Sequence, residues 1–270
     1  PTDLAIRACR EAVVRAGIMP ERIGLILAEC TYPLQSVPCE AQRVAGLLEL
    51  KIPAYDVNSG GVGLPFFLDR LAKWRPDALP EYVLCLSVST PTHAVDYSRG
   101  VEGLVFGDGA GAAVVSLVQE GPLQVMGAFW ETRCLDEIPS YPLTGHISLN
   151  AGSMGLARRQ RVERLAGVLN AMRCCVDSSQ SATLILSSSF MFAGIDGIGN
   201  GNTYSLWGGN RKYGELMEVG AFCALAEAWD TFEPEWEWCL IEPGFGLGYG
   251  GVVLRSHVGK VGLQEGCERE

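Results

Sequence analysis

No stretch of this sequence approaches the roughly 20 consecutive apolar residues that a membrane-spanning helix needs. Basic residues are also few, with 21 Lys and Arg against 31 Asp and Glu, which gives a net charge of −10. That balance argues against nucleic acid and anionic membrane surfaces as partners, because both need a basic surface. The first residues, Pro1 to Cys9, lack the apolar core of a signal peptide, so we expect a cytoplasmic protein.

The metal-site spacing C-x-x-C is missing, although the chain has ten cysteines. Cys174 and Cys175 are adjacent and have no histidine cluster nearby. Cys85 and Cys223 lie inside apolar runs, where a thiol behaves as a small hydrophobic group. The sequence therefore predicts structural cysteines, no metal site and no cofactor.

Alternating helical and strand patterns run through the first 90 residues. Thr2 can cap the first helix, and Gly17 can end it in a left-handed turn. This alternation predicts an α/β layered fold with a mostly parallel sheet. The predicted helices are 3–16, 40–48 and 62–74, and the predicted strands are 24–28, 54–57 and 82–89.

A glycine-rich turn that leads into an apolar strand occurs twice. It reads FGDGAGAAVV at 106–115 and GFGLGYGGVVL at 244–254. Because each copy would close one α/β unit, the repeat predicts an internally duplicated domain, with halves at 1–131 and 132–256 and a tail at 257–270. In the second half we expect helices at 162–172 and 216–229, strands at 183–186 and 238–242, and irregular segments at 132–155 and 194–214.

These glycine motifs resemble those of the ketoacyl-acyl-carrier-protein synthase III branch of the thiolase superfamily. The opening helix and YDVNSGGVG, at 55–63, agree in order and spacing, so the resemblance runs from Asp3 to about Ser256. It implies a thiolase-like duplicated fold of two α/β halves, with layered sheets and buried helices. Family members begin with one more strand before the helix at 3–16, so we expect an uncovered sheet edge in the first half.

The resemblance places the family's nucleophilic cysteine at Gly61. A thiolate at a helix N-terminus has a lowered pKa and can accept an acyl group from a thioester. Glycine has no side chain and cannot be acylated. Gly61 is instead expected to form a tight turn between strand and helix.

The family's catalytic histidine follows the strand at 183–186, where this chain has Ser187 and Ser188. Those serines are more often a polar strand end than donors to a bound carbonyl. The three histidines of the chain, at 93, 146 and 257, lie elsewhere in the sequence. His146 falls in the segment 132–155, which we expect to cover the site as a loop.

The family's catalytic asparagine corresponds to Glu215, which follows Tyr213 and Gly214. Histidine and asparagine together donate hydrogen bonds to the oxyanion, whereas a carboxylate would repel that charge. Asparagines at 200, 202 and 210 lie close in sequence, so the alignment of this position stays open.

Two other polar residues are candidate catalysts. Ser59 is a candidate for a displaced nucleophile, although no histidine has an evident path to it. Asp108, in the glycine-rich turn, is expected to accept backbone N–H bonds and hold the turn rather than act as a base.

A homodimer of this chain would hold no complete catalytic set. We therefore expect a non-catalytic subunit that pairs with a catalytically intact ketosynthase-III-like chain through the strand Tyr82–Ser89. The complex would use acyl-CoA or acyl-carrier-protein thioesters, in secondary-metabolite, polyketide or alkylquinolone-type biosynthesis. Two alternatives stay open: a stand-alone acyltransferase with an unusual nucleophile, and a module that binds an acyl chain or a carrier protein.

Overall fold

The computed structural model describes seven segments of the chain: residues 1–99, 106–132, 182–186, 206–208, 213–232, 237–244 and 248–257. Its α-helices are α1 (Thr2–Ala16), α2 (Glu40–Leu47), α3 (Gly63–Lys73) and α5 (Gly220–Ala228). Its strands are β1 (Ile23–Cys30), β2 (Ala54–Val57), β3 (Tyr82–Ser89), β4 (Gly109–Ser116), β5 (Leu123–Thr132), β6 (Ala182–Leu186), β7 (Leu206–Gly208), β8 (Glu237–Pro243) and β9 (Gly248–Ser256). Short 3-10 helices include η3 (Pro91–Ala94) and η7 (Met217–Val219).

The strands form two sheets with the same order. The first sheet runs β2-β1-β3-β4, and the second runs β7-β6-β8-β9 with β5 added outside β9. In each sheet the first three strands are parallel and the fourth is antiparallel. Among the described residues, no strand lies against the outer edge of β4, the place that β5 takes beside β9.

The pairing of the strands can be followed along one row of residues in each sheet. One row of paired residues crosses the first sheet as Ala54, Ile26, Leu84 and Val114. The equivalent row crosses the second sheet as Leu206, Leu184, Cys239, Val253 and Gly127. Because the same strand order and the same strand directions recur across four strands of each sheet, the two halves share one architecture.

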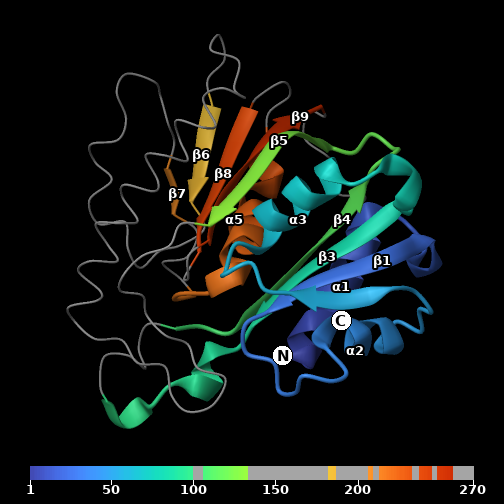
Figure 1. Cartoon of the computed structure of the whole chain (residues 1–270). Helices are drawn as coiled ribbons and strands as arrows, with labels where there is room; N and C mark the ends of the chain where they lie inside the picture. The colour runs from blue at the N-terminus through green and yellow to red at the C-terminus, as the bar shows by residue number, and fades with distance from the viewer. Residues whose placement is uncertain are drawn as a thin grey trace, which may run out of the picture.

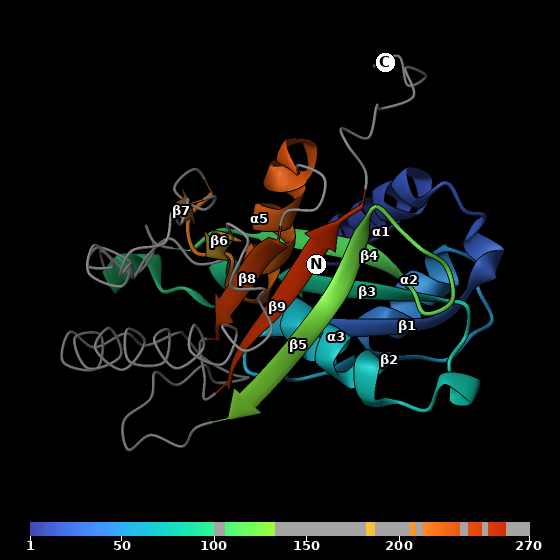
Figure 2. The same ribbon diagram turned by 90° about the horizontal axis from the view of Figure 1, so that it is seen from above.

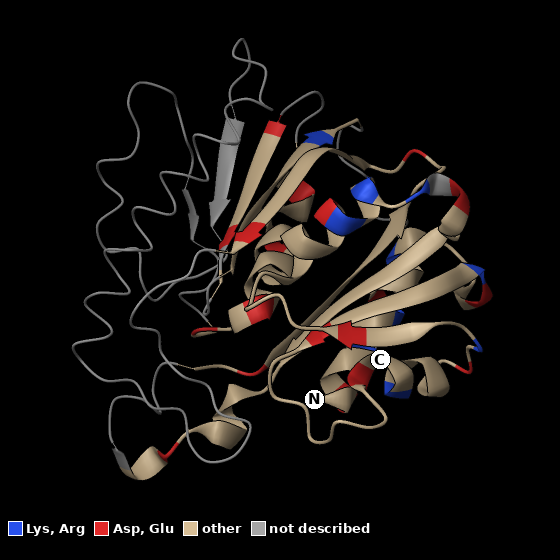
Figure 3. Cartoon of the chain, viewed as in Figure 1, with Lys and Arg blue, Asp and Glu red and all other residues tan. Residues whose placement is uncertain are grey.

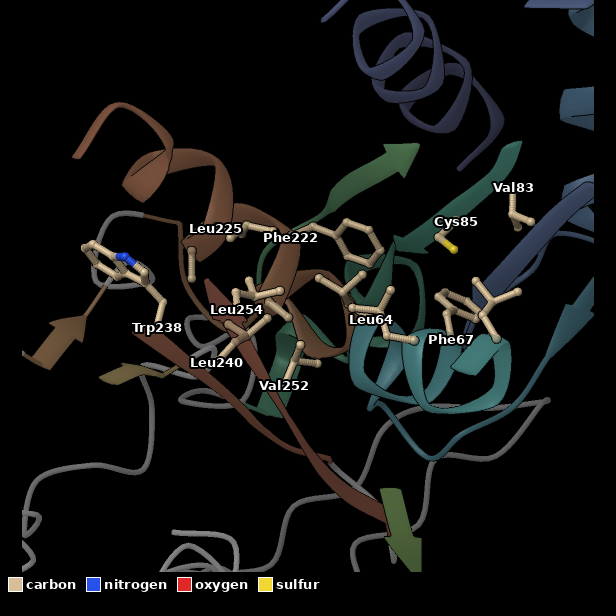
Figure 4. Packing of buried hydrophobic residues seen from close by; sticks show 14 of the residues in the cluster. Leu64, Phe67, Val83, Cys85, Phe222, Leu225, Trp238, Leu240, Val252 and Leu254 are labelled. Atoms are coloured by element: carbon tan, nitrogen blue, oxygen red, sulfur yellow. The ribbon is translucent and has the colours of Figure 1, made fainter. Parts of the chain in front are cut away.

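Helices α3 and α5 lie between the two sheets, while α1 and α2 cover the outer face of the first sheet (Figures 1 and 2). Strand β3 contributes side chains to the hydrophobic layers on both faces of the first sheet, because successive side chains along a strand point to opposite faces. Val83 and Cys85 face the central core, and Leu84 and Leu86 face α1 and α2. Figure 4 shows the central core, to which α3 contributes Phe67, α5 contributes Phe222 and β8 contributes Leu240.

Most predicted elements are confirmed to within one or two residues, and Gly17 does end α1 in a left-handed conformation with φ 63°. Thr2 is already helical, so its predicted role as the N-cap is wrong. The predicted helix 216–229 starts as η7 and becomes α-helical only at Gly220. The segment 194–214, predicted to be irregular, contains a short strand, β7. The glycines and asparagines around it do not favour a strand, so the sequence did not predict it. The predicted helix 162–172 and the segment 133–155 lie outside the described residues.

The prediction that β3 offers a free edge to a partner is wrong. Tyr82–Ser89 is the third strand of the sheet, with β1 on one side and β4 on the other. Every residue of β3 is buried inside this chain, which explains its apolar sequence without a partner. Strand β5 also lies in the second sheet, ahead of the predicted boundary between residues 131 and 132.

Candidate functional site

The turn between β2 and α3 holds the position of the predicted missing nucleophile. Gly60 and Gly61 adopt positive φ angles of 75° and 84°, a region that side-chain-bearing residues rarely enter. Gly61 is buried, and α3 begins two residues later. The geometry agrees with the prediction that Gly61 forms a tight turn between strand and helix.

One buried carboxylate holds this turn in place. Glu29, at the end of β1, accepts hydrogen bonds from the Ser59 N–H at 2.9 Å, the Ser59 hydroxyl at 2.6 Å and the Gly61 N–H at 3.1 Å. Both carboxylate oxygens are used. The Gly61 amide therefore points at a side chain of its own chain.

Ser59 serves the same turn. Its hydroxyl donates to Glu29 and accepts the Val62 N–H at 3.0 Å, and its side chain is almost fully buried. Its carbonyl accepts the indole N–H of Trp130 on β5 at 3.3 Å. These contacts assign Ser59 to holding the turn.

The glycines of the second repeat let the second half approach this turn. A methyl group at Gly244 would lie 2.3 Å from the Gly60 carbonyl oxygen, and one at Gly248 would lie 2.4 Å from that of Ser59. The first repeat does the reverse, since a methyl group at Gly111 would lie 2.2 Å from Cβ of Phe222 in α5. In each half, the glycine-rich segment thus lets the other half pack closely against its backbone.

Glu215 lies against the first glycine-rich turn. Its carbonyl accepts the Gly107 N–H at 3.1 Å, and Phe106 forms a β-bridge with it. Its buried carboxylate accepts the Met217 N–H at 3.1 Å. In the same turn, the Asp108 carboxylate accepts the Thr92 N–H at 3.1 Å and the Thr92 hydroxyl at 2.6 Å. The prediction that Asp108 accepts a backbone N–H is confirmed, and the donor belongs to η3.

Two further carboxyls are buried near Glu29. Burial, followed by the nearby charge of Glu29, raises the pKa of Glu218 to about 8. Burial also raises the pKa of Glu242 well above its usual value, and the charges of Glu29, Glu218 and Glu215 add to this shift. Burial raises the pKa of Glu29 too, while its three hydrogen bonds oppose the shift. The charges of Glu29 and Glu215 both raise the pKa of Glu242. Because Glu29 also binds the turn at Gly61, this turn and Glu215 belong to one acidic region.

The other predicted site positions are spread out or not described. Ser187, Ser188 and His146 lie outside the described residues. His93 is exposed on η3, and His257 follows β9, where its ring contacts Gln124. In the part of the chain that the structure describes, no group of three or more His, Cys, Asp or Glu residues could hold a metal ion. Likewise, none of the described helices is both long and apolar enough to cross a bilayer.

Sequence reasoning missed the carboxyls at 29, 218 and 242. Glu29 and Glu242 end the apolar strand sequences LILAE and CLIE, where a lone acid invites assignment to a solvent-facing strand end. An acid directly after a fully buried strand was the available signal. Only the packing of the second half over the first shows that these strand ends are covered.

Comparison with known proteins gives partial sequence matches. No family model matches the sequence. Over 121 residues, 44% of this chain, it is 33% identical to the beta-ketoacyl-acyl-carrier-protein synthase III of Campylobacter jejuni subsp. doylei, of which the match spans 37%. The enzyme of the same name from Coxiella burnetii is 30% identical over 122 residues, which span 38% of its length. The matches therefore span less than half of these relatives.

Solved structures match almost the whole chain. The 3-oxoacyl-acyl-carrier-protein synthase III of Pseudomonas aeruginosa aligns with a TM-score of 0.75 and 20% identity over 96% of this chain and 84% of that one. A tetronic acid condensing enzyme gives 0.78 and 18% over 94% and 82%. The priming beta-ketosynthase of the R1128 polyketide pathway gives 0.77 and 17% over 95% and 81%.

The chain is thiolase-like in fold and resembles the ketoacyl synthases III. Both the predicted fold class and the predicted resemblance are confirmed. In this ketosynthase-III-like chain, β2, α3 and the glycine-rich strands β4 and β9 build the centre, and Gly61 lies at the turn where β2 meets α3.

Proposed function

We propose that this chain is a non-catalytic ketosynthase-III-like subunit that assists an active homologue in acyl condensation or acyl transfer. Its named relatives include ketoacyl synthases III, a tetronic acid condensing enzyme and a priming ketosynthase of a polyketide pathway. The complex would draw acyl groups from CoA or carrier-protein thioesters. These names give the chemical class, and the turn at Gly61 gives the argument against catalysis by this chain.

The observation that supports the proposal most directly is that glycine occupies position 61 and that its N–H is already hydrogen-bonded. It offers no nucleophilic atom, and its N–H donates to Glu29 at 3.1 Å. A bound acyl oxygen would need that kind of backbone donor during thioester chemistry. The chain thus uses for its own turn the group that an acyl oxygen would need.

The acidic surroundings support the same conclusion. Glu215 takes the position of the family's asparagine in our alignment, and Glu218 and Glu242 are buried nearby. Decarboxylative condensation develops negative charge on an oxygen, which hydrogen-bond donors stabilise and carboxylates repel. A site with these residues is poorly suited to that step.

The structure offers two strand edges for a partner in place of the predicted β3. Among the described residues, β2 and β4 are the edge strands of the first sheet. Unpaired edge groups favour association with another strand or a covering segment. A partner that pairs at an edge is consistent with the proposed heterodimer.

Co-expression with a homologue that keeps cysteine, histidine and asparagine tests this proposal. We expect the two chains to co-purify and the acyl condensation to depend on the homologue's cysteine. A stable monomer in light scattering that condenses acyl groups alone would overturn the proposal.

A further inference from the structure

A buried carboxyl group links the two halves of the molecule. Glu218 belongs to η7 of the second half, and its Oε1 accepts the N–H of Thr31, which follows β1 of the first half, at 2.7 Å. The side chain of Glu218 is fully buried. This hydrogen bond joins residues 187 positions apart, next to the turn that Glu29 holds.

Several polar oxygens around this link are buried without a partner among the described residues. They are Oε2 of Glu218, Oε2 of Glu242 and the hydroxyls of Ser87 and Ser89. Ser87 lies close to Glu29, because a methyl group at Gly63 would meet Oγ of Ser87 at 2.2 Å and Oε2 of Glu29 at 3.2 Å. The carboxyl ends of β1, β3 and β8 therefore place buried polar groups in one region of the interior.

In the described segments, the titratable groups recorded around the link are acidic, apart from the N-terminal amine, which acts on Cys30 together with Glu40 and Asp56. Glu29 and Cys30 come from β1 and Glu242 from β8, and the remaining groups are Tyr32, Glu215 and, on α5, Cys223. In the described segments, neither Glu29, Glu218 nor Glu242 forms an ion pair with Lys or Arg. Figure 3 shows acidic residues at the ends of β8 and in the turn before α5, and no Lys or Arg on the ribbons of β1, β3 and β8.

We propose that Glu29, Glu218 and Glu242 form a proton-controlled lock between the two halves. Three carboxylates cannot all be charged in a buried site without a cation, so protons must neutralise part of the set. A protonated Glu218 keeps its bond to Thr31 and gains an O–H donor for a neighbouring acceptor. Ionisation places like charges side by side and weakens the contact between the halves. This lock does not depend on the proposed function.

The direction of the pH effect follows from linkage. The folded-state pKa of Glu218 is raised to about 8 from an ordinary value of 4.5. Stability from this group is therefore fully present below about pH 4.5 and is lost as the pH rises toward 8, because the unfolded chain releases its proton first. Each such group lowers the folding equilibrium constant by about tenfold per pH unit in that window.

Urea unfolding of the full chain between pH 5 and pH 8.5 tests the lock. We expect the midpoint of the wild type to fall across this range and the midpoint of Glu218→Gln to fall less, since glutamine keeps the acceptor for Thr31 and does not titrate. The control is Glu227→Gln, an exposed position on α5, which should follow the wild type. Amide exchange at Thr31, corrected for its intrinsic pH dependence, should accelerate with pH in the wild type and accelerate less in Glu218→Gln.

Glu242→Gln gives a second measurement if Glu218→Gln does not fold. It removes one of the charges that act on Glu218, so the fall in midpoint should again be smaller than in the Glu227→Gln control. Equal pH slopes in a folded Gln variant and the control would overturn the proposal. Exchange at Thr31 that is independent of pH in the wild type would overturn it as well.

Discussion

A single carboxylate defines the centre of this molecule at the residue scale. Glu29 satisfies three donors of the turn that carries Gly61, all of them buried. Buried donors without a partner are costly, and a carboxylate that accepts several N–H and O–H groups binds them more strongly than a neutral acceptor. Glu29 therefore sets the shape of the turn and occupies its amide groups.

Replacing Glu29 by glutamine should destabilise the protein by about 2–4 kcal/mol. The amide has one acceptor oxygen, so its NH₂ group would face donors of the turn. The matched control is Glu11→Gln, where an exposed pair with Arg15 is lost and the change should stay below about 0.5 kcal/mol. Urea unfolding measures both changes, and equal values for the two variants would contradict this role of Glu29.

Asp108 could be placed from the sequence because it lies in the specific string FGDGAGA, and Gly61 because YDVNSGGVG agrees with the family in order and spacing. The glycines beside them mark each turn in the sequence itself. Glu29, Glu218 and Glu242 could not be placed, since their burial depends on contacts between residues far apart in sequence. The sequence shows that these residues are acidic, but whether a strand end is covered depends on tertiary packing.

Strand β3 shows the same limit at the scale of elements. Its apolar run predicted the strand to the residue, because a strand buried on both faces has little alternation. The run did not tell an interior strand from one at a subunit interface, since both are buried. The ladder settles the question, because Leu86 is paired with Ala28 of β1 and with Ala112 of β4.

A proline at Leu86 should therefore unfold the chain rather than only separate it from a partner. Proline removes a ladder donor and leaves a buried carbonyl unsatisfied, which costs about 1–3 kcal/mol beyond the lost side-chain packing. Leu86→Val keeps the ladder and should cost less than about 1.5 kcal/mol. Circular dichroism with urea titration compares the two. A Leu86→Pro chain with wild-type stability would contradict the interior position of β3.

The two glycine-rich strands explain how the whole molecule is assembled. The sequence revealed the repeat, and the structure shows that each copy receives the opposite half, with Gly111 against Phe222 and Gly248 against Ser59. A repeated string indicates duplication, but the exchange of contacts between halves depends on the pseudo-symmetric packing of the sheets. Local sequence patterns do not predict this packing, because it depends on contacts between distant residues.

Gly111→Ala should destabilise the packing of the halves by about 1–3 kcal/mol, because its methyl group would meet Cβ of Phe222 at 2.2 Å. Gly46→Ala is the matched control. Gly46 is exposed in α2 with nothing within 4 Å of an added methyl group, so alanine there should raise stability by about 0.5–1 kcal/mol. Thermal unfolding should give shifts of opposite sign, and a neutral Gly111→Ala would contradict close packing between the halves.

The central claim, that this chain does not carry an acyl group on the Gly61 turn, is tested most directly by intact-mass measurement after incubation with an acyl-CoA. Gly61 has no thiol, and both the donor and the acceptor function of the Ser59 hydroxyl are used within the turn. The account predicts an unchanged mass for the wild type and for Ser59→Ala. A stoichiometric acyl adduct on the wild type that disappears in Ser59→Ala would contradict it.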